Sequence, residues 1–235
     1  MRALAALLVI ASGASGCAPA GPVLAGGRTT PRERSDVALG AAVRVPVTDL
    51  VPPAAGDARE LTSFGAPGGA TPLALVRYGL SDQVELGVES LGAGGRLTLR
   101  AQLPSEGMLR LLVGLAPEAA AVWSEPREGT QGGSAFRGGV SLPILLAIDV
   151  LSLFEVWLGP RWGALHVAGD SAGRAVSLTG MRTGGVVGLA VGFRRVHVMV
   201  ELAVDHEYWT GHLASAYVER HALVLTPAFA VRLRL

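Results

Sequence analysis

The sequence contains no lysine, so all 20 of its basic residues are arginines, and they nearly balance the 19 acidic residues to give a formal net charge of +1. This charge argues against a nucleic-acid partner, which would require a strongly basic surface. The single cysteine excludes an internal disulfide framework and a Cys-x-x-Cys metal site. After the N-terminus, no apolar run approaches the roughly 18 residues of a membrane-spanning helix. The length of 235 residues is compatible with one β domain.

The N-terminus has the features of an export signal. A positive residue is followed by an apolar core that is too short to act as a stop-transfer helix, so we expect a signal peptide over residues 1–16. The stretch Ala-Ser-Gly-Cys ending at Cys17 resembles a bacterial lipobox, which implies lipid attachment at Cys17. It departs from that pattern at Ala14, where a branched aliphatic residue is preferred. The alternative is ordinary cleavage after Ala20, with Cys17 removed.

The next segment, residues 17–34, is rich in proline, glycine and charge and has no hydrophobic periodicity. This composition predicts a flexible lipid tether. The remaining residues, 35–235, are predicted to form one β-barrel domain.

Within that domain, apolar and polar residues alternate with a period of two. Val84, Leu86 and Val88 share one face of a predicted strand, while Glu85 and Glu89 share the other. Such alternation is typical of a strand with two different faces. We predict ten antiparallel strands, with eight to twelve possible, at about 36–47, 71–80, 83–91, 95–103, 107–124, 133–148, 152–168, 185–194, 196–208 and 221–235.

The predicted connections alternate between short and long. The second, fourth, sixth and eighth are short, whereas most of the others are long or rich in glycine, including 169–184 and 209–220. Alternating short turns and long loops indicate an up-and-down transmembrane barrel. An even strand number also places both ends of the domain on the short-turn side.

The apolar face could point outward to lipid or inward, as in a soluble lipocalin-like barrel. Three features favour the outward arrangement: a simple apolar face of Val, Leu and Ala, strands longer than ten residues, and a polar face that carries charges of both signs. We therefore expect the charged side chains to line the lumen, namely Glu85, Glu89, Arg96, Arg100, Arg110, Glu155, Arg161, Arg195, Glu201, Asp205, Arg232 and Arg234.

Two stretches carry a resemblance to a known class. The hairpin Tyr78–Val88 and the last strand, Phe229–Leu235, resemble parts of small outer-membrane β-barrel proteins of Gram-negative bacteria. The last strand departs from the class by ending on leucine, where phenylalanine or tryptophan is usual. The resemblance implies an outer-membrane location after export through a cleaved signal peptide. It also implies outer-membrane lipid and the barrel assembly machinery as partners.

Aromatic residues near predicted strand ends suggest contacts at the membrane interface. Amphipathic rings prefer that position, so we expect Trp123, Tyr208 and Trp209 to act as interfacial anchors.

No catalytic or cofactor motif is found. The stretch Asp205-His206-Glu207 with His212 matches no known metal-site spacing, so these are expected to be solvated loop residues. The sequence therefore favours a non-catalytic role, either structural or in binding through the loops at 169–184 and 209–220. Two alternatives stay open: a periplasmic lipoprotein whose soluble barrel carries an apolar ligand, and a barrel enzyme that acts on envelope lipid, for which His166, Asp170 and Ser171 supply suitable residue types.

Overall fold

The computed structural model describes residues 21–51, 68–104, 107–124, 133–150, 153–171, 173–193 and 195–235. These residues form ten β-strands: β1 (Ser35–Val51), β2 (Gly69–Gly79), β3 (Val84–Leu91), β4 (Gly94–Leu103), β5 (Leu109–Ser124), β6 (Gly133–Val150), β7 (Phe154–Ser171), β8 (Arg174–Phe193), β9 (Val196–Leu213) and β10 (Ala216–Arg234). In the part of the chain described, no helix is long and apolar enough to cross a membrane.

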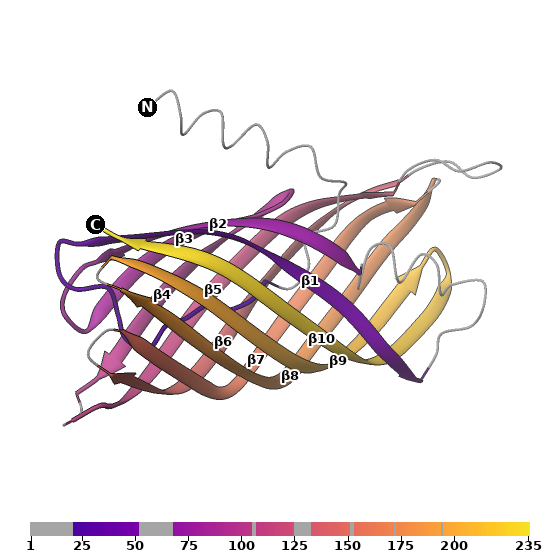
Figure 1. Ribbon diagram of the computed structural model, residues 1–235. Coiled ribbons are helices and arrows are strands. Elements are labelled where there is room, and N and C mark those ends of the chain that lie inside the picture. Colours follow the sequence, from indigo (N-terminus) through magenta and orange to yellow (C-terminus); the bar gives the residue numbers. More distant parts are fainter. Residues whose placement is uncertain are drawn as a thin grey trace.

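The ten strands close into one barrel (Figure 1). Each strand pairs antiparallel with its neighbours in the sequence, and β1 also pairs with β10 along a seam that runs from Asp36–Arg234 to Val51–His221. Closure gives every strand two hydrogen-bonded neighbours, as in barrels that remove the open edges of a sheet. The predicted class, an all-β antiparallel up-and-down barrel of about ten strands, is confirmed.

The two ends of the barrel differ. We call the end that carries Ser35 and Leu235 the termini end and the opposite one the far end. The termini end has the connections 80–83, 104–108, 151–153 and 194–195, whereas the far end has 52–68, 92–93, 125–132, 172–173 and 214–215. The prediction of long loops at 169–184 and 209–220 is wrong. Strands β7, β8, β9 and β10 continue through these residues and are joined by hairpins of two connecting residues.

The strands alternate between an outer and an inner face. Leu86 and Val88 point outward and are 43% and 56% exposed, whereas Glu85 and Glu89 point inward and are 1% and 2% exposed. The apolar face thus lies outside, and the alternative of an apolar face turned inward does not hold for this strand. Outward apolar side chains continue around the wall, as at Leu99, Leu115, Leu146, Leu158, Val187, Val200 and Val231.

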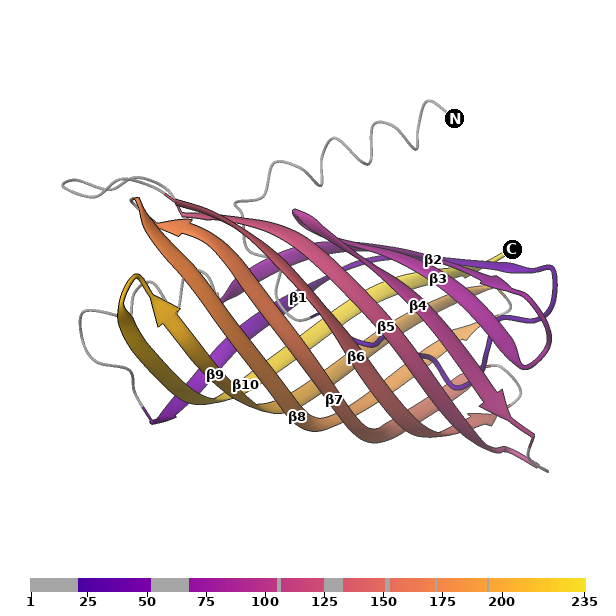
Figure 2. The same cartoon turned by 180° about the vertical axis from the view of Figure 1, so that it is seen from behind.

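The wall is uneven in height. Strands β2, β3 and β4 have 8 to 11 residues, whereas β6 to β10 have 18 to 20. The taller strands therefore extend the barrel on one side at the far end (Figures 1 and 2). Inside this extension lies a buried apolar group, which we call the far-end cluster: Ala135, Leu165, Val167, Val176, Leu178, Trp209, Leu213 and Val218.

Candidate functional site

The lumen is lined with arginines and carboxylates. Nine of the twelve charged residues predicted there are at most 4% exposed, while Arg110 and Arg234 are less buried, with side chains 25% and 12% exposed. The prediction is wrong for Arg195, which is exposed because it lies in the connection between β8 and β9. Further inward charges come from Asp36, Arg44, Arg77, Glu118, Arg137, Asp149, Arg182, Glu207 and Arg220. The period-two alternation that identified the first set also places the additional residues, because each lies on the inward face of its strand.

Ion pairs along the inner wall connect strands that are not hydrogen-bonded to each other. Arg161 on β7 reaches Asp205 on β9, with Nε 2.8 Å from Oδ1 and a second guanidinium nitrogen on Oδ2. Both side chains span β8 at Gly184, where an added Cβ would come within 2.4 Å of the Asp205 carboxylate. Arg44 on β1 likewise binds Glu207 on β9. Two-point contacts of this kind hold a guanidinium in a defined orientation, which makes the lumen wall a rigid polar surface.

The charged wall holds a segment of the same chain. Residues 21–34, which we call the luminal segment, precede β1 and run inside the barrel (Figure 2). Three of their backbone N–H groups donate to glutamates of the wall: Val23 to Glu201 at 2.6 Å, Gly27 to Glu155 at 2.7 Å and Thr30 to Glu85 at 2.6 Å. Each glutamate thus receives a charge-assisted hydrogen bond from the segment.

The carbonyl groups of the luminal segment face arginines. Arg77 alone reaches three successive carbonyl oxygens, with Nη1 3.0 Å from Ala25 and Nη2 3.1 Å and 2.8 Å from Val23 and Leu24. The other arginine contacts are Arg96 to Pro22 at 2.8 Å, Arg161 to Gly21 at 3.3 Å, Arg100 to Arg28 at 3.0 Å and Arg100 to Ala25. The wall therefore recognises both the donors and the acceptors of this backbone.

The backbone of the luminal segment is turned rather than extended. Leu24 and Gly26 have positive φ values of 39° and 72°, which gather the carbonyls of residues 23–25 around one guanidinium. The Leu24 side chain is completely buried among apolar residues that include Trp157. At Gly26 an added Cβ would lie 2.5 Å from the guanidinium of Arg232, and at Gly27 it would lie 3.0 Å from the side chain of Glu155. The site thus has one buried apolar position and two glycine positions where a side chain would crowd its neighbours, and at Gly26 the positive φ would also strain it.

This arrangement differs from the flexible tether predicted over residues 17–34. The described part of that range is mostly buried, because wall residues up to 178 positions away in sequence satisfy its backbone groups. Polar, aperiodic composition carried no signal of these long-range partners. The predicted signal peptide and Cys17 lie outside the described residues.

Two tryptophans also point into the lumen. The indole N–H of Trp157 donates to Glu201 at 2.9 Å, so this ring supports the carboxylate that binds the Val23 amide. The ring covers Gly188 of β8, where an added Cβ would come within 2.1 Å of it. A glycine opposite the ring is therefore required for Trp157 to reach Glu201.

The prediction that Trp209 is an interfacial anchor is wrong. It is 1% exposed, belongs to the far-end cluster and donates to Glu207 at 3.1 Å. Neighbouring residues of a strand point to opposite faces, so Tyr208 and Trp209 cannot both point outward. Tyr208 is the outward one and lies 4.6 Å from the ring of His221. The side chain of Trp123 lies outside the described residues.

The residues considered for chemistry are separated. Asp205 and Glu207 point into the lumen, whereas His206 lies on the outer face and contacts His221 at 3.4 Å. Within the described ranges, no group of three or more His, Cys, Asp or Glu side chains could hold a metal ion. His166 and Asp170 lie four residues apart on β7, which is roughly 13 Å along a strand and too far for direct acid–base contact.

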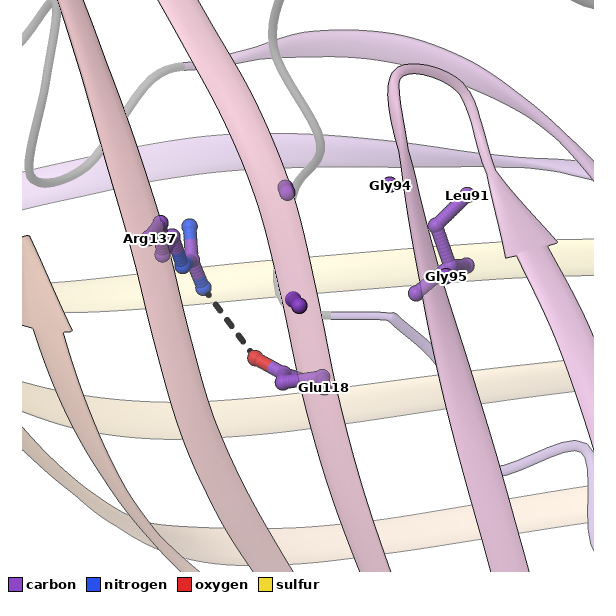
Figure 3. Close-up of a pocket in the computed structure, with 7 residues that line it drawn as sticks. Leu91, Gly94, Gly95, Glu118 and Arg137 are labelled. Atoms are coloured by element: carbon purple, nitrogen blue, oxygen red, sulfur yellow. Dashed lines mark hydrogen bonds and ion pairs between the residues drawn. The ribbon is translucent and has the colours of Figure 1, made fainter.

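A small void lies at the inner wall of the barrel. Leu91, Gly94, Gly95, Glu118 and Arg137 surround a cavity of about 10 Å³, where Arg137 lies 3.4 Å from Glu118 (Figure 3). That volume suits about one water molecule. A larger groove of about 350 Å³ opens over β5 to β9, lined by residues that include the outward Leu115, Leu142, Trp162, Met181 and Tyr208.

Comparisons with known proteins show similarity in architecture only. No family model and no curated protein matches the chain. Among solved structures, it is similar to the Escherichia coli outer membrane protease OmpT, with 11% identity, a TM-score of 0.41 and coverage of 86% of this chain and 96% of that one. It is also similar to the Ralstonia pickettii toluene transporter TbuX, with 10% identity, a TM-score of 0.38 and coverage of 95% of this chain and 96% of that one. A further similar structure is Neisserial surface protein A, NspA, with 12% identity, a TM-score of 0.35 and coverage of 86% of this chain and 96% of that one. These scores are low, so the function must be argued from the wall and lumen of this chain.

Proposed function

We propose that the protein is an outer-membrane β-barrel with a structural or binding role and no catalytic activity. One observation carries this proposal: the closed wall turns its apolar side chains outward and its charges inward. An arginine on a lipid-facing position costs roughly 2–4 kcal/mol near the bilayer midplane, so this distribution suits a barrel surrounded by lipid. In water, the same outer face would expose a continuous apolar surface of the kind that drives association.

The outer apolar surface on β9 comes close to the apolar band of about 25 Å that outer-membrane barrels present to lipid. On β9 the outward residues are apolar from Val196 to Val204, which spans roughly 20 Å along the membrane normal at about 3.3 Å per residue and a tilt of about 40°. The next outward residues, His206, Tyr208 and Thr210, are polar or amphipathic. We place the upper membrane boundary at this change, with the termini end in the periplasm and the far end outside the cell.

This orientation assigns the binding role to the tall side of the wall. The hairpins between β7 and β8 and between β9 and β10 extend beyond the apolar belt and present polar outer residues such as Ser177, Thr179 and His212. They occupy the positions that the sequence assigned to binding loops. The luminal segment and the far-end cluster fill much of the interior, so this role does not require an open pore.

The export features complete the proposal. A signal peptide over residues 1–16 and lipidation of Cys17 would anchor the chain a second time, and the barrel assembly machinery would insert the barrel. Incorporation of radioactive palmitate into the wild-type protein but not into Cys17→Ala would support lipidation. Equal labelling of the two proteins, or no labelling of either, would reject it.

Gel mobility tests the barrel itself. We expect the protein from the outer-membrane fraction to migrate differently before and after boiling in dodecyl sulfate, because a closed barrel resists the detergent until it is heated. A protein that is released without detergent and shows no mobility shift would overturn the proposal. A control variant, Thr210→Arg, changes a residue outside the apolar belt. This variant should fold and show the same change of gel mobility on boiling as the wild type.

A further inference from the structure

The barrel wall is complete without the luminal segment. β1 pairs directly with β10 and β2, so every strand of the barrel has its two neighbours. Among the described residues, the segment makes only one isolated bridge to the wall, between Arg32 and Gly79. The segment therefore occupies the lumen as a guest and is not a strand of the sheet.

The groups that bind the segment are also held by the wall itself. Glu85 pairs with Arg100 at 2.8 Å, and Glu155 pairs with Arg232 at 2.7 Å. Glu201 accepts from the indole N–H of Trp157 at 2.9 Å. Each of the three glutamates keeps a partner when the segment is absent, so the wall forms a preorganised set of donors and acceptors, and preorganisation favours binding.

The fit of the segment is selective at four positions. Leu24 and Ala25 are completely buried in the apolar cluster that also contains Trp157, so neither position has room for a much larger side chain. Gly26 and Gly27 lie against Arg232 and Glu155, where any Cβ would force a neighbour to move. The polar contacts of residues 23–27 reach backbone atoms, so the chemistry of this part of the site matches the pattern Leu-Ala-Gly-Gly in a turned peptide. Outside it, Arg28 lies 3.7 Å from Asp149 and the Thr29 hydroxyl donates to the carbonyl of Asp82 at 3.0 Å.

We infer that the lumen is a peptide-binding site for Leu-Ala-Gly-Gly sequences, and that residues 23–27 are its exchangeable ligand, held in cis. The covalent link keeps the segment at high effective concentration and excludes competing peptides. Once the link is cut, a free peptide of the same sequence takes its place. This inference concerns the lumen alone and does not depend on the outer-membrane proposal. Peptide exchange can fail while the barrel proves to be an outer-membrane protein, and peptide exchange can succeed while the barrel proves not to be one.

The link is accessible for a direct test. Arg32 and Glu33 have side chains 68% and 73% exposed, so a recognition sequence for a specific protease can be inserted between them. The folded variant is cut in detergent and washed on a column, and boiled and unboiled samples are compared to verify that the barrel remains folded. A fluorescent peptide of residues 21–30, labelled at its C-terminus, is then added and its anisotropy is measured.

We expect saturable binding to the cut barrel and none to the uncut barrel. Unlabelled peptide should compete, while peptides with Gly26→Val or with a methylated Val23 amide should compete about tenfold less well or worse, because they lose space or the donor to Glu201. A peptide with Val23→Ala is the matched control and should compete nearly as well as the original, since the Val23 side chain is only partly buried.

Three results would overturn the inference. The cut fragment could remain through washing and never exchange, the barrel could unfold when the fragment leaves, or all peptides could bind equally regardless of sequence. The first two would make the segment a permanent part of the fold, and the third would make the binding nonspecific.

A second measurement uses the full chain without cutting. Cys17→Ser with Ala25→Cys puts the only thiol at a completely buried position of the segment. An impermeant maleimide should label this thiol slowly, and adding Glu155→Gln and Glu201→Gln should raise the labelling rate about tenfold, because two amides of the segment lose charged acceptors. An unchanged rate in the folded variant would contradict the role of these glutamates in holding the ligand.

Discussion

Along β9, the stretch from Val196 to Val204 and the stretch from His206 to Leu213 have the same strand geometry, but the chemistry of their faces differs, most clearly on the outside. In the first stretch the outer face is valine and leucine, and the inner face carries Glu201. In the second stretch the outer face is polar, and the inner face joins the far-end cluster. The comparison shows that alternation identifies a strand and separates its faces, while the chemistry of each face depends on what surrounds that part of the barrel.

The largest expected effect concerns the charged inner face. Replacing Asp205 with leucine leaves Arg161 without its carboxylate, and breaking a buried ion pair costs about 3–5 kcal/mol. Urea unfolding in lipid vesicles measures this change in the free energy of unfolding. The double variant Asp205→Leu with Arg161→Met should recover most of the loss. A single variant as stable as the wild type would show that the inner charges contribute little to the barrel.

The far-end cluster should respond to a loss of apolar volume instead. Leu178 is completely buried in this cluster, so Leu178→Ala should lower the free energy of unfolding by roughly 2–5 kcal/mol. The matched control on the outer face of the same strand is Thr179→Ala, which should change the stability by less than about 0.5 kcal/mol. Similar effects of the two substitutions would mean that this part of the wall has no apolar interior.

The outer face allows the sharpest comparison of the two stretches of β9. Val200→Arg places a charge in the middle of the proposed apolar belt and should cost roughly 2–4 kcal/mol in vesicles, whereas Thr210→Arg beyond the belt should cost about 0–1 kcal/mol. Folding yield and urea midpoints in vesicles measure the difference. Equal costs at the two positions would place the membrane boundary elsewhere or remove it.

The change of surroundings between the apolar belt and the far end explains which strands the sequence could predict and which it could not. The ten strands followed from alternation, but residues such as Ser177 and Thr179 read as a loop because their outward positions are polar. The alternation of Asp205, Glu207 and Trp209 would have placed Trp209 inside the barrel. Tertiary contacts alone place the luminal segment, since no local pattern pairs the amide of Thr30 with Glu85, 55 residues later.

The smallest expected effect concerns the hairpin that joins the second stretch of β9 to β10. Ala214 has a φ of 56°, a left-handed conformation in which an alanine is strained and a glycine is not. Ala214→Gly should therefore stabilise the protein by up to about 1 kcal/mol, partly offset by the greater freedom of glycine in the unfolded chain. Gly173 has a φ of 77° in the neighbouring hairpin, so Gly173→Ala is the opposite substitution and should destabilise by a similar amount. Urea midpoints of the two variants should move in opposite directions, and a shift in the same direction would mean that the far-end hairpins do not hold these turns in the folded barrel.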